Sequence, residues 1–276
     1  MDMLSDESIV RIKFRLSVDR ELEIPPFSSK VSRTIVLSMV GDKPVLDGDR
    51  YKSYTISPLL VNNRPLIRVV DATVSDKAYN LRLYPSNEYS FYVSAIGSDM
   101  ITAILSGKKD IQLFNGTFTI SGIELTATTF HTISLEKGDD IIIRFVTPAL
   151  LQLPRKWGER KRAGNFLFPV PSLLIWSVAQ HWNRYAPQDL KIESCKRLAV
   201  YSNFAMLEMD YSLRPLAVVY NEVSRPKGIT GWVRWHIDDF DEGLAVQLRR
   251  ILAYAQYFGV GRSRSIGFGM VDIVRP

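Results

Sequence analysis

Hydrophobic and polar residues alternate over Val10–Val18, the most regular pattern in the first half of the chain. Every even position is apolar, whereas Arg11, Lys13 and Arg15 occupy the first three odd positions between them. A period of two predicts a strand with one buried face. Three cations on the other face would repel one another, so we expect them to be solvated or to face an anion.

A helical pattern follows this strand. The segment Pro25–Ser29 is stiffened by two prolines and supplies an N-cap serine, which predicts a helix from Lys30 to Val40. Its apolar residues recur at helical spacing, and Gly41 ends the pattern. Lys30 and Arg33 lie three residues apart and therefore share another face of the same helix.

The rest of the first half predicts further strands and one more helix. The helix is expected over Ser98–Leu105, and the strands over Arg50–Ser57, Leu66–Val70, Tyr89–Ser94 and Gly116–Thr126. Apart from one additional strand between the two helices, the order is roughly strand, helix, strand, strand, helix, strand. This order is the ferredoxin-like pattern, in which two helices cover one face of a sheet.

The same order begins again with the apolar strand Asp140–Val146. A helix over Pro171–Tyr185, a less certain segment up to Asp210, and a helix that starts near Asp241 and ends at Gly259 follow. The expected strands of this half are Leu216–Glu222, Gly231–Ile237 and Phe268–Val274. We therefore predict an α+β fold of two tandem ferredoxin-like (RRM-like, βαββαβ) domains, 1–139 and 140–276, with a glycine-rich loop before the last strand.

Composition narrows the class of protein. With 276 residues, 46% hydrophobic and 23% charged, the chain is long and apolar enough for real cores and does not have a disordered composition. The net charge of +6 favours a polyanionic partner. Cys195 is the single cysteine, which excludes an internal disulfide and fits a reducing cytoplasm. The sequence has neither a signal-peptide pattern nor an apolar run of membrane-spanning length, so we expect a cytoplasmic protein without a membrane partner.

The glycine-rich loop, Phe258–Gly269, is the stretch with the most distinctive chemistry. Its arginines can bind phosphate in a bidentate way, and glycine lets backbone amides approach a ligand, so the loop suits a sugar-phosphate chain. The spacing fits neither a dinucleotide-binding fingerprint nor a P-loop. A helix C-cap glycine followed by a bulged strand with solvated arginines is the structural alternative. The candidate residues of this loop are Gly259, Gly261, Arg262, Arg264, Gly267 and Gly269.

Five motifs in order resemble a known family. They are Pro26–Thr34, Tyr51–Leu59, Arg144–Pro148, Gly231–Trp235 and Phe258–Gly269. Together they are similar to the CRISPR repeat-processing endoribonucleases of the RAMP superfamily, in particular the archaeal, crenarchaeal-type enzymes. Each motif alone is weak, but their order along nearly the whole chain is specific.

The resemblance implies an RNA-binding cleft between two ferredoxin-like domains and metal-independent cleavage of CRISPR precursor RNA within its repeats. The RNA 2′-hydroxyl would attack the adjacent phosphate and leave a 2′,3′-cyclic phosphate and a 5′-hydroxyl. No cofactor and no metal are expected, and the partner is CRISPR repeat RNA. A CRISPR effector complex and a homodimer remain open as further partners.

The chain departs from the family in its histidines. Many members carry a histidine shortly after the first helix, but positions 31–50 contain none. His131, His181 and His236 lie outside the five motifs, and core or surface roles are the simpler interpretation for them. A histidine-based mechanism therefore does not carry over.

Basic residues in the matching motifs are the remaining catalytic candidates. Lys30 and Lys52 are expected closest to the scissile phosphate, with Arg225 at the second-domain turn and Tyr51 orienting the nucleophile. Free lysine has a pKa of about 10.4 and is a poor base at neutral pH, but it can protonate a leaving oxygen or neutralise phosphorane charge. The alternative is that these cations are solvated or only anchor phosphate.

Other basic residues are predicted to bind RNA. Arg33 lies on the first helix, and Lys227 lies in the same second-domain turn as Arg225. In the glycine-rich loop, the backbone amides and both arginines are the candidates. A basic run could grip a second stretch of RNA, with its tryptophan stacking on a base, or could be a solvated loop. Its residues are Lys156, Trp157, Arg160, Lys161 and Arg162. A catalytically silent repeat-RNA-binding protein or structural RAMP subunit is the alternative function, and an unrelated pair of RRM-like sheets ranks last.

Overall fold

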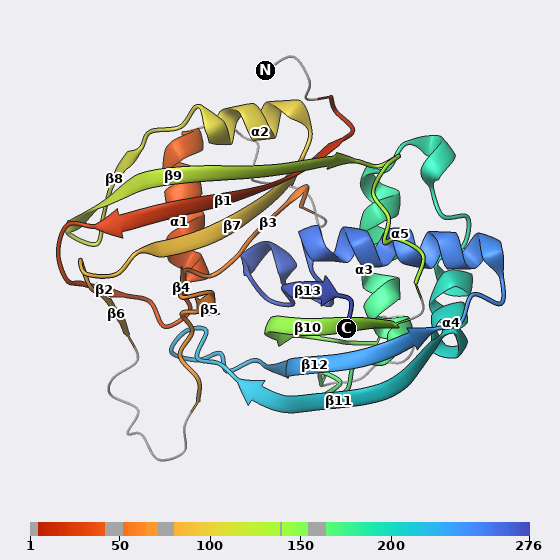
Figure 1. Ribbon diagram of the computed structural model, residues 1–276. Coiled ribbons are helices and arrows are strands. Elements are labelled where there is room, and N and C mark those ends of the chain that lie inside the picture. Colours follow the sequence, from red (N-terminus) through yellow and green to blue (C-terminus); the bar gives the residue numbers. More distant parts are fainter. Residues whose placement is uncertain (1–4, 42–51, 71–79, 139, 154–163) are drawn as a thin grey trace. The chain divides into compact units, whose positions relative to one another are not determined.

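A computed structural model describes residues 5–41, 52–70, 80–138, 140–153 and 164–276 (Figure 1). The chain divides into two compact units, and each combines a sheet with helices in a mixed α+β fold. The first unit comprises Met1–Thr129, Ala217–Pro226 and Ser265–Gly267. The second comprises Phe130–Leu216, Lys227–Arg264 and Phe268–Pro276.

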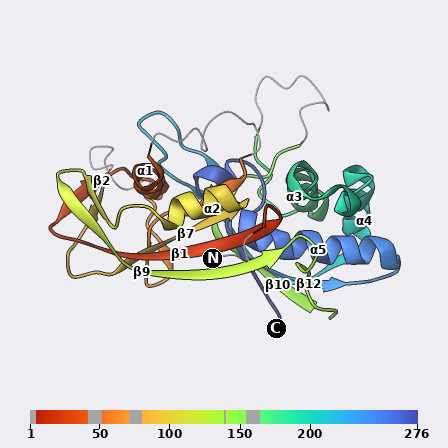
Figure 2. The same ribbon diagram turned by 90° about the horizontal axis from the view of Figure 1, so that it is seen from above.

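The first unit is built around a long antiparallel sheet. Strand β1 (Ser8–Val18) lies between β7 (Tyr89–Ile96) and β9 (Gly116–Thr129), and the path through the sheet is β5-β4-β7-β1-β9-β8. The shorter strands are β2 (Leu22–Ile24), β3 (Tyr54–Ile56), β4 (Leu60–Val61), β5 (Arg64–Pro65), β6 (Leu81–Leu83) and β8 (Asp110–Leu113). Strand β3 pairs with β7, and β2 pairs with β6 in a separate ribbon. Helices α1 (Ser29–Val40) and α2 (Ser98–Leu105) cover one face of the large sheet (Figure 2).

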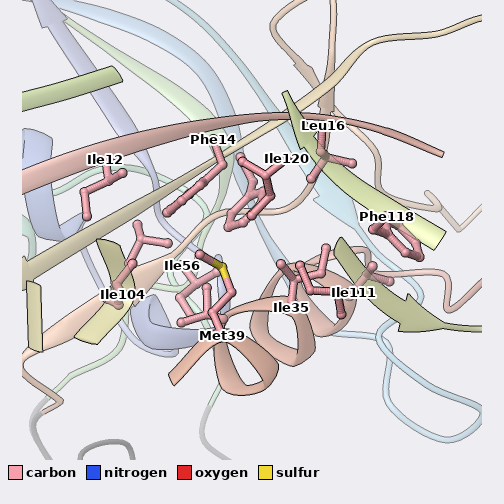
Figure 3. Close-up of a cluster of buried hydrophobic side chains, with 14 of the residues drawn as sticks. Ile12, Phe14, Leu16, Ile35, Met39, Ile56, Ile104, Ile111, Phe118 and Ile120 are labelled. Carbon is pink, nitrogen blue, oxygen red and sulfur yellow. The ribbon is translucent and has the colours of Figure 1, made fainter. Parts of the chain in front are cut away.

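The core of the first unit lies between this face and the two helices. Figure 3 shows Phe14 of β1 lying above Ile35 and Met39 of α1. Phe14 also stacks on Phe91 of β7 with ring centroids 5.0 Å apart. All the even positions from Val10 to Val18 are buried, which confirms the strand that the alternation predicts. Removing a buried aromatic ring from such a core typically costs about 3–5 kcal/mol.

The cations on the other face of β1 have partners on neighbouring strands. The Arg15 side chain donates a hydrogen bond of 2.9 Å to Glu124 of β9, and Lys13 Nζ lies 4.0 Å from the same carboxylate. Arg11 lies over the ring of Tyr92, 4.3 Å from its centroid. The hydrogen bond from Arg15 lowers the pKa of Glu124. The expected repulsion is thus relieved by a cross-strand carboxylate and an aromatic ring.

The second unit has a four-stranded sheet with helices on one face (Figure 2). Its strands are β10 (Asp140–Ala149), β11 (Met206–Ala217), β12 (Lys227–Ile237) and β13 (Val271–Val274). Its helices are α3 (Pro171–Tyr185), α4 (Cys195–Ala205) and α5 (Glu242–Phe258), with short 3₁₀ turns at Gln188–Leu190 and Arg264–Ile266. Phe130, Trp182 and Tyr254 form an aromatic cluster at its core, with Trp182 and Tyr254 centroids 5.1 Å apart.

The two sheets share a strand order. In the first unit, β3, β7, β1 and β9 are hydrogen-bonded neighbours in that order. In the second unit the order is β11-β12-β10-β13. Numbered within each unit along the chain, both orders are second, third, first, fourth. In each unit a helix follows the first strand and another follows the third. The repeated element order expected from the sequence therefore corresponds to a repeated sheet topology.

Most predicted elements are present, but two predicted strands are wrong. The helices expected over 30–40, 98–105 and 171–185 are confirmed within a residue. Leu66–Val70 does not form a regular strand, and only the first two residues of Leu216–Glu222 do, as the end of β11. An isolated bridge joins Val69 and Val218. Apolar residues in these segments signalled burial, but the segments make too few ladder bonds to count as strands. Helix α4 and the start of β11 lie in the stretch that the sequence left uncertain.

Within the described ranges, none of the helices has the length and apolar character needed to span a membrane.

Candidate functional site

Ser28, the residue directly before α1, joins three segments of the first unit. Ser28 occupies the N-cap position but makes no side-chain cap to its own helix. Instead, its buried hydroxyl donates to the Leu66 carbonyl at 2.6 Å and accepts from the Leu59 backbone N–H at 2.9 Å. Leu59 and Leu66 flank the β4–β5 hairpin, so Ser28 fastens this hairpin to the start of the helix.

The next residue binds the tip of the glycine-rich loop. The Ser29 hydroxyl donates to the Ile266 carbonyl at 2.7 Å. Gly267 follows with φ of +89°, and a Cβ there would lie 2.9 Å from both the Pro58 Cδ and the Ser29 Cβ. Glycine is required at this position for its backbone conformation and for the close approach. The chain is thereby held against the N-terminal end of α1.

Lys30 is positioned by an aromatic residue that sequence reasoning missed. Its Nζ lies over the ring of Tyr220 at 4.5 Å from the centroid, and the same ring packs against Phe27 at 5.6 Å. A cation–π contact of this kind is worth about 0.5–1 kcal/mol at exposed sites and more where water is excluded. Tyr220 lies in the apolar stretch from Leu216, where the pattern indicated only a strand and gave no sign of a lysine partner.

The other catalytic candidates are distributed over neighbouring segments. Arg225 lies in the same turn as Tyr220, and its guanidinium donates to the carbonyls of Asn221 and Ser224. Arg33 is half-buried one turn along α1 from Lys30, and Lys52 is half-buried two residues before β3. The structure therefore brings the segments of Lys30 and Arg225 together at Tyr220. Tyr51 lies outside the described residues.

The amides of the glycine-rich loop that belong to the second unit already have partners. The backbone N–H groups of Gly259, Gly261 and Gly269 donate to Ala255 O at 2.7 Å, Ser177 Oγ at 3.0 Å and Pro148 O at 3.0 Å. A Cβ on Gly269 would lie 1.9 Å from the Val260 carbonyl oxygen. These glycines permit positive φ and tight packing in the structure. RNA binding by their amides stays a prediction, and the geometry gives it no support.

The basic side chains predicted to bind RNA differ in exposure. Arg262 is exposed and donates to Gln152, whereas Arg264 is half-buried and donates to the Gly259 carbonyl at 3.4 Å. Lys227 is exposed at the first position of β12. The segment with Lys156, Trp157, Arg160, Lys161 and Arg162 lies outside the described residues.

All three histidines belong to the second unit, whereas Lys30 belongs to the first. His181 is buried with its Nδ1 2.7 Å from the Tyr254 hydroxyl, and burial raises the pKa of Tyr254. His236 Nδ1 lies 2.9 Å from Asp140, and hydrogen bonds from His236 and Arg234 lower the pKa of that carboxyl. His131 lies 3.4 Å from Asp189. The contact of His181 is buried, whereas His131 and its partner are exposed. Among the described residues, no group of three or more His, Cys, Asp or Glu side chains could hold a metal ion.

The arrangement at α1 suits an anion. Lys30 is held on an aromatic ring at the positive end of a twelve-residue helix, and Arg225 lies in the turn that supplies the ring. A lysine held in this way can offer a proton and a positive charge to a phosphate oxygen. Neither role requires a bound metal ion.

Comparison with known proteins identifies matches over nearly the whole chain. The model of the Cas6 N-terminal domain matches residues 10–128, and that of the CRISPR-associated endoribonuclease Cas6 matches residues 143–271. A relative from Saccharolobus solfataricus, described as CRISPR-associated endoribonuclease Cas6 1, is 25% identical, with 96% of each chain covered. A second protein of that organism, CRISPR-associated endoribonuclease Cas6 2, is 26% identical over the same shares.

Solved structures show the same fold. A Cas6 product complex superposes with a TM-score of 0.72 at 15% identity, covering 96% of this chain and 100% of the other. The Thermus thermophilus Cas6 gives a TM-score of 0.65 at 13% identity, covering 96% of this chain and 98% of the other. A RAMP protein described as binding different RNA substrates gives 0.56 at 16% identity, with 96% and 100% covered.

Proposed function

Because the chain belongs to the Cas6 family of CRISPR-associated endoribonucleases, we propose that it cleaves CRISPR precursor RNA within its repeats without a metal ion. The products would be guide RNAs with 5′-hydroxyl and 2′,3′-cyclic phosphate ends. The observation that carries this proposal is the placement of Lys30 on the ring of Tyr220, at the helix end where Ser29 holds the glycine-rich loop. The proposed setting is the cytoplasm, which the single cysteine favours.

The proposed reaction is an in-line transesterification within the RNA. The 2′-oxygen forms a bond to the adjacent phosphorus, the bond from phosphorus to the 5′-oxygen breaks, and the 2′-hydroxyl proton passes to water. Lys30 donates a proton to the leaving 5′-oxygen, and Lys52 and Arg225 neutralise charge on the phosphorane. Tyr51 keeps its predicted role of orienting the nucleophile, and RNA contacts by Arg33, Lys227, Arg262 and Arg264 belong to the same proposal.

The absence of a histidine in this mechanism has a kinetic consequence. A positioned acid or base of suitable pKa contributes typically about 10²–10⁴ in rate, and free lysine with a pKa of about 10.4 is poorly matched to neutral pH as a base. We therefore expect single-turnover cleavage to be slower than in relatives that carry a histidine after the first helix. Cleavage as fast as theirs would contradict the lysine-based mechanism.

The two units are also proposed to be tandem ferredoxin-like domains, 1–139 and 140–276. Support comes from the shared strand order of the two sheets and from the helices that follow the first and third strand of each. Two short segments of 140–276, Ala217–Pro226 and Ser265–Gly267, belong to the first compact unit, so the units do not coincide with these domains at every residue.

One assay tests the function directly. The purified protein is incubated with labelled repeat RNA in EDTA, and the product ends are mapped. We expect one cut per repeat with a cyclic-phosphate end. Tight binding without any product would instead support a catalytically silent RNA-binding protein or a structural RAMP subunit. Cleavage that occurs only after Mg²⁺ is added would overturn the metal-independent mechanism.

A further inference from the structure

The first unit contains a polar cavity of about 290 Å³ that the proposed reaction does not use. It lies beside the β4–β5 hairpin, the 86–88 loop with the start of β7, and β1. Figure 1 shows β4 and β5 next to the lower end of α1. The volume is close to the lower end of the roughly 300–1,000 Å³ range of small-molecule pockets, so it suits one small ligand group rather than a duplex.

Hydrogen-bonding side chains dominate the lining of this cavity. They include three amides, two serine hydroxyls, one ammonium and one carboxylate, from Asn62, Asn63, Asn87, Ser86, Ser90, Lys13 and Glu88. A phosphate site would gather positive charge, but here one cation is matched by one anion. Carboxamides offer a donor and an acceptor side by side, as the edge of a nucleobase does. The chemistry of the lining therefore fits an uncharged group with both donors and acceptors.

The walls of the cavity are held in place by the sheet. Asn62 and Asn63 have φ values of +50° and +60°, the conformation of a two-residue hairpin turn, so the turn places two carboxamides at the hairpin tip. Leu60 of the hairpin pairs with Ser90 of β7. On the other side, the Tyr89 hydroxyl accepts from the Tyr84 N–H at 2.6 Å and donates to the Tyr84 carbonyl at 3.2 Å, which fixes the 86–88 loop.

The hairpin is also connected to the lysine site. Ser28 binds Leu59 at one end of the hairpin and Leu66 at the other, and it lies two residues before Lys30. A group bound in the cavity and a phosphate at Lys30 would therefore be held by one continuous piece of the first unit.

We propose that this cavity binds the base of one unpaired nucleotide of the RNA substrate and reads its identity. The inference rests on the proposed function, since it assumes that RNA is the ligand. An unpaired base is required, because single-stranded RNA exposes its base edges to amide side chains, whereas a duplex hides them. Asn62 and Asn63 supply the reading groups, and Lys13 and Glu88 border them.

The test uses a panel of repeat RNAs in which each unpaired position is changed in turn. The variant N62G/N63G removes both carboxamides, and glycine adopts the positive φ of the turn readily. We expect the wild-type protein to discriminate at one position by roughly tenfold or more in affinity, and the variant to lose this preference.

A matched control is available in the same sheet. Asn115 has φ of +63° in the turn between β8 and β9, away from the residues that line the cavity, so Asn115→Gly makes the same chemical change elsewhere. This control should discriminate as the wild type does. The isosteric variant Glu88→Gln, at an exposed side chain, should alter the preference at the same RNA position while leaving the hairpin untouched.

The possible results separate the two proposals. If the protein cleaves repeat RNA but N62G/N63G discriminates as the wild type does, the cavity proposal is wrong and the proposed function stands. If preference disappears in N115G as well, a general effect on the sheet explains it and the cavity proposal also fails. If a 2′-deoxy substitution at one unpaired position lowers affinity while changing the base there does not, the cavity binds the sugar and the proposal of base recognition is wrong. A wild-type protein that binds no repeat RNA would end both proposals.

Discussion

Helices α1 and α5 both begin with a polar N-cap residue, but they use it in different ways. At α5, the Asp241 carboxylate accepts a hydrogen bond from the Leu244 N–H at 3.0 Å, so the side chain stabilises its own helix. At α1, Ser28 leaves its helix uncapped and binds Leu59 and Leu66 instead. The preference for an N-cap side chain that bonds to its own helix is therefore met at α5 but not at α1.

A glycine packs against one end of each helix, but at α5 it is the next residue in the sequence and at α1 it comes from a distant segment. Gly259 directly ends α5 and donates to Ala255 within the same helix. Gly267 instead comes from the far end of the chain and packs against Ser29 at the start of α1. Departures from local preference tend to occur at functional or strained sites, where other interactions compensate for them. The comparison therefore supports the proposal that the site lies at α1 rather than at α5.

The largest expected effect is the loss of the Lys30 amine. In Lys30→Ala, we expect single-turnover cleavage to fall by about 10²–10⁴ while RNA affinity changes little, because the lysine acts in the transition state. Lys196→Ala, at an exposed lysine of α4, is the control and should cleave normally. If Lys30→Ala mainly weakens binding and lowers the salt slope by about one unit, Lys30 is a phosphate anchor and not a proton donor.

The second largest effect is expected when the contact between the glycine-rich loop and α1 is disrupted at Gly267. An alanine at Gly267 would adopt a left-handed conformation at a cost of roughly 1–2 kcal/mol and would also press on Pro58 and Ser29. We expect Gly267→Ala to lower both the melting temperature and the cleavage rate. Gly41→Ala has the same kind of φ, +71°, but nothing lies within 4 Å of the added Cβ. Equal behaviour of the two variants would show that the close contact at Gly267 has no functional importance.

The two N-cap residues give a direct test of the comparison. Ser28→Ala leaves the buried Leu59 N–H without its partner, which typically costs about 1–3 kcal/mol, and should also reduce cleavage because the hairpin is released from α1. Asp241→Ala removes a cap worth typically about 1 kcal/mol and should leave cleavage unchanged. Urea unfolding measures the stability of both variants. If Asp241→Ala impairs cleavage as much as Ser28→Ala does, the two helices do not differ in function.

Sequence reasoning succeeded where periodicity is local and failed where distant segments meet. The alternation over Val10–Val18 and the helical spacing after Ser29 were sufficient for β1 and α1, because each pattern reflects burial against one face. The pairing of Val69 with Val218 could not be predicted, since neither segment specifies its partner. Lys30 was found through the family motif. Its partner Tyr220 was not found, because it lies 190 positions away and nothing in its own segment specifies the contact.

The glycine-rich loop is a second case in which the sequence did not specify the contact partner. Its glycines suggested amides directed at a ligand, because glycine is needed wherever backbone comes close to something else. In the structure that neighbour is the protein itself: Gly261 donates to Ser177, and Gly269 packs on Val260. A sequence shows that a close approach occurs, but it does not show what is approached.

The smallest expected effect concerns the ring beneath Lys30. In Tyr220→Leu the cation–π contact is lost, and because such a contact is worth about 0.5–1 kcal/mol, we expect cleavage to fall by roughly two- to fivefold. Tyr220→Phe keeps the ring and should keep most of the rate. Both variants should unfold at similar urea concentrations if the remaining contact with Phe27 maintains the packing. A positioning role requires the leucine variant to lose cleavage rate without a matching loss of RNA affinity. If the phenylalanine variant is as slow as the leucine variant, the hydroxyl and not the ring is what matters, and Tyr220 acts through another group than Lys30.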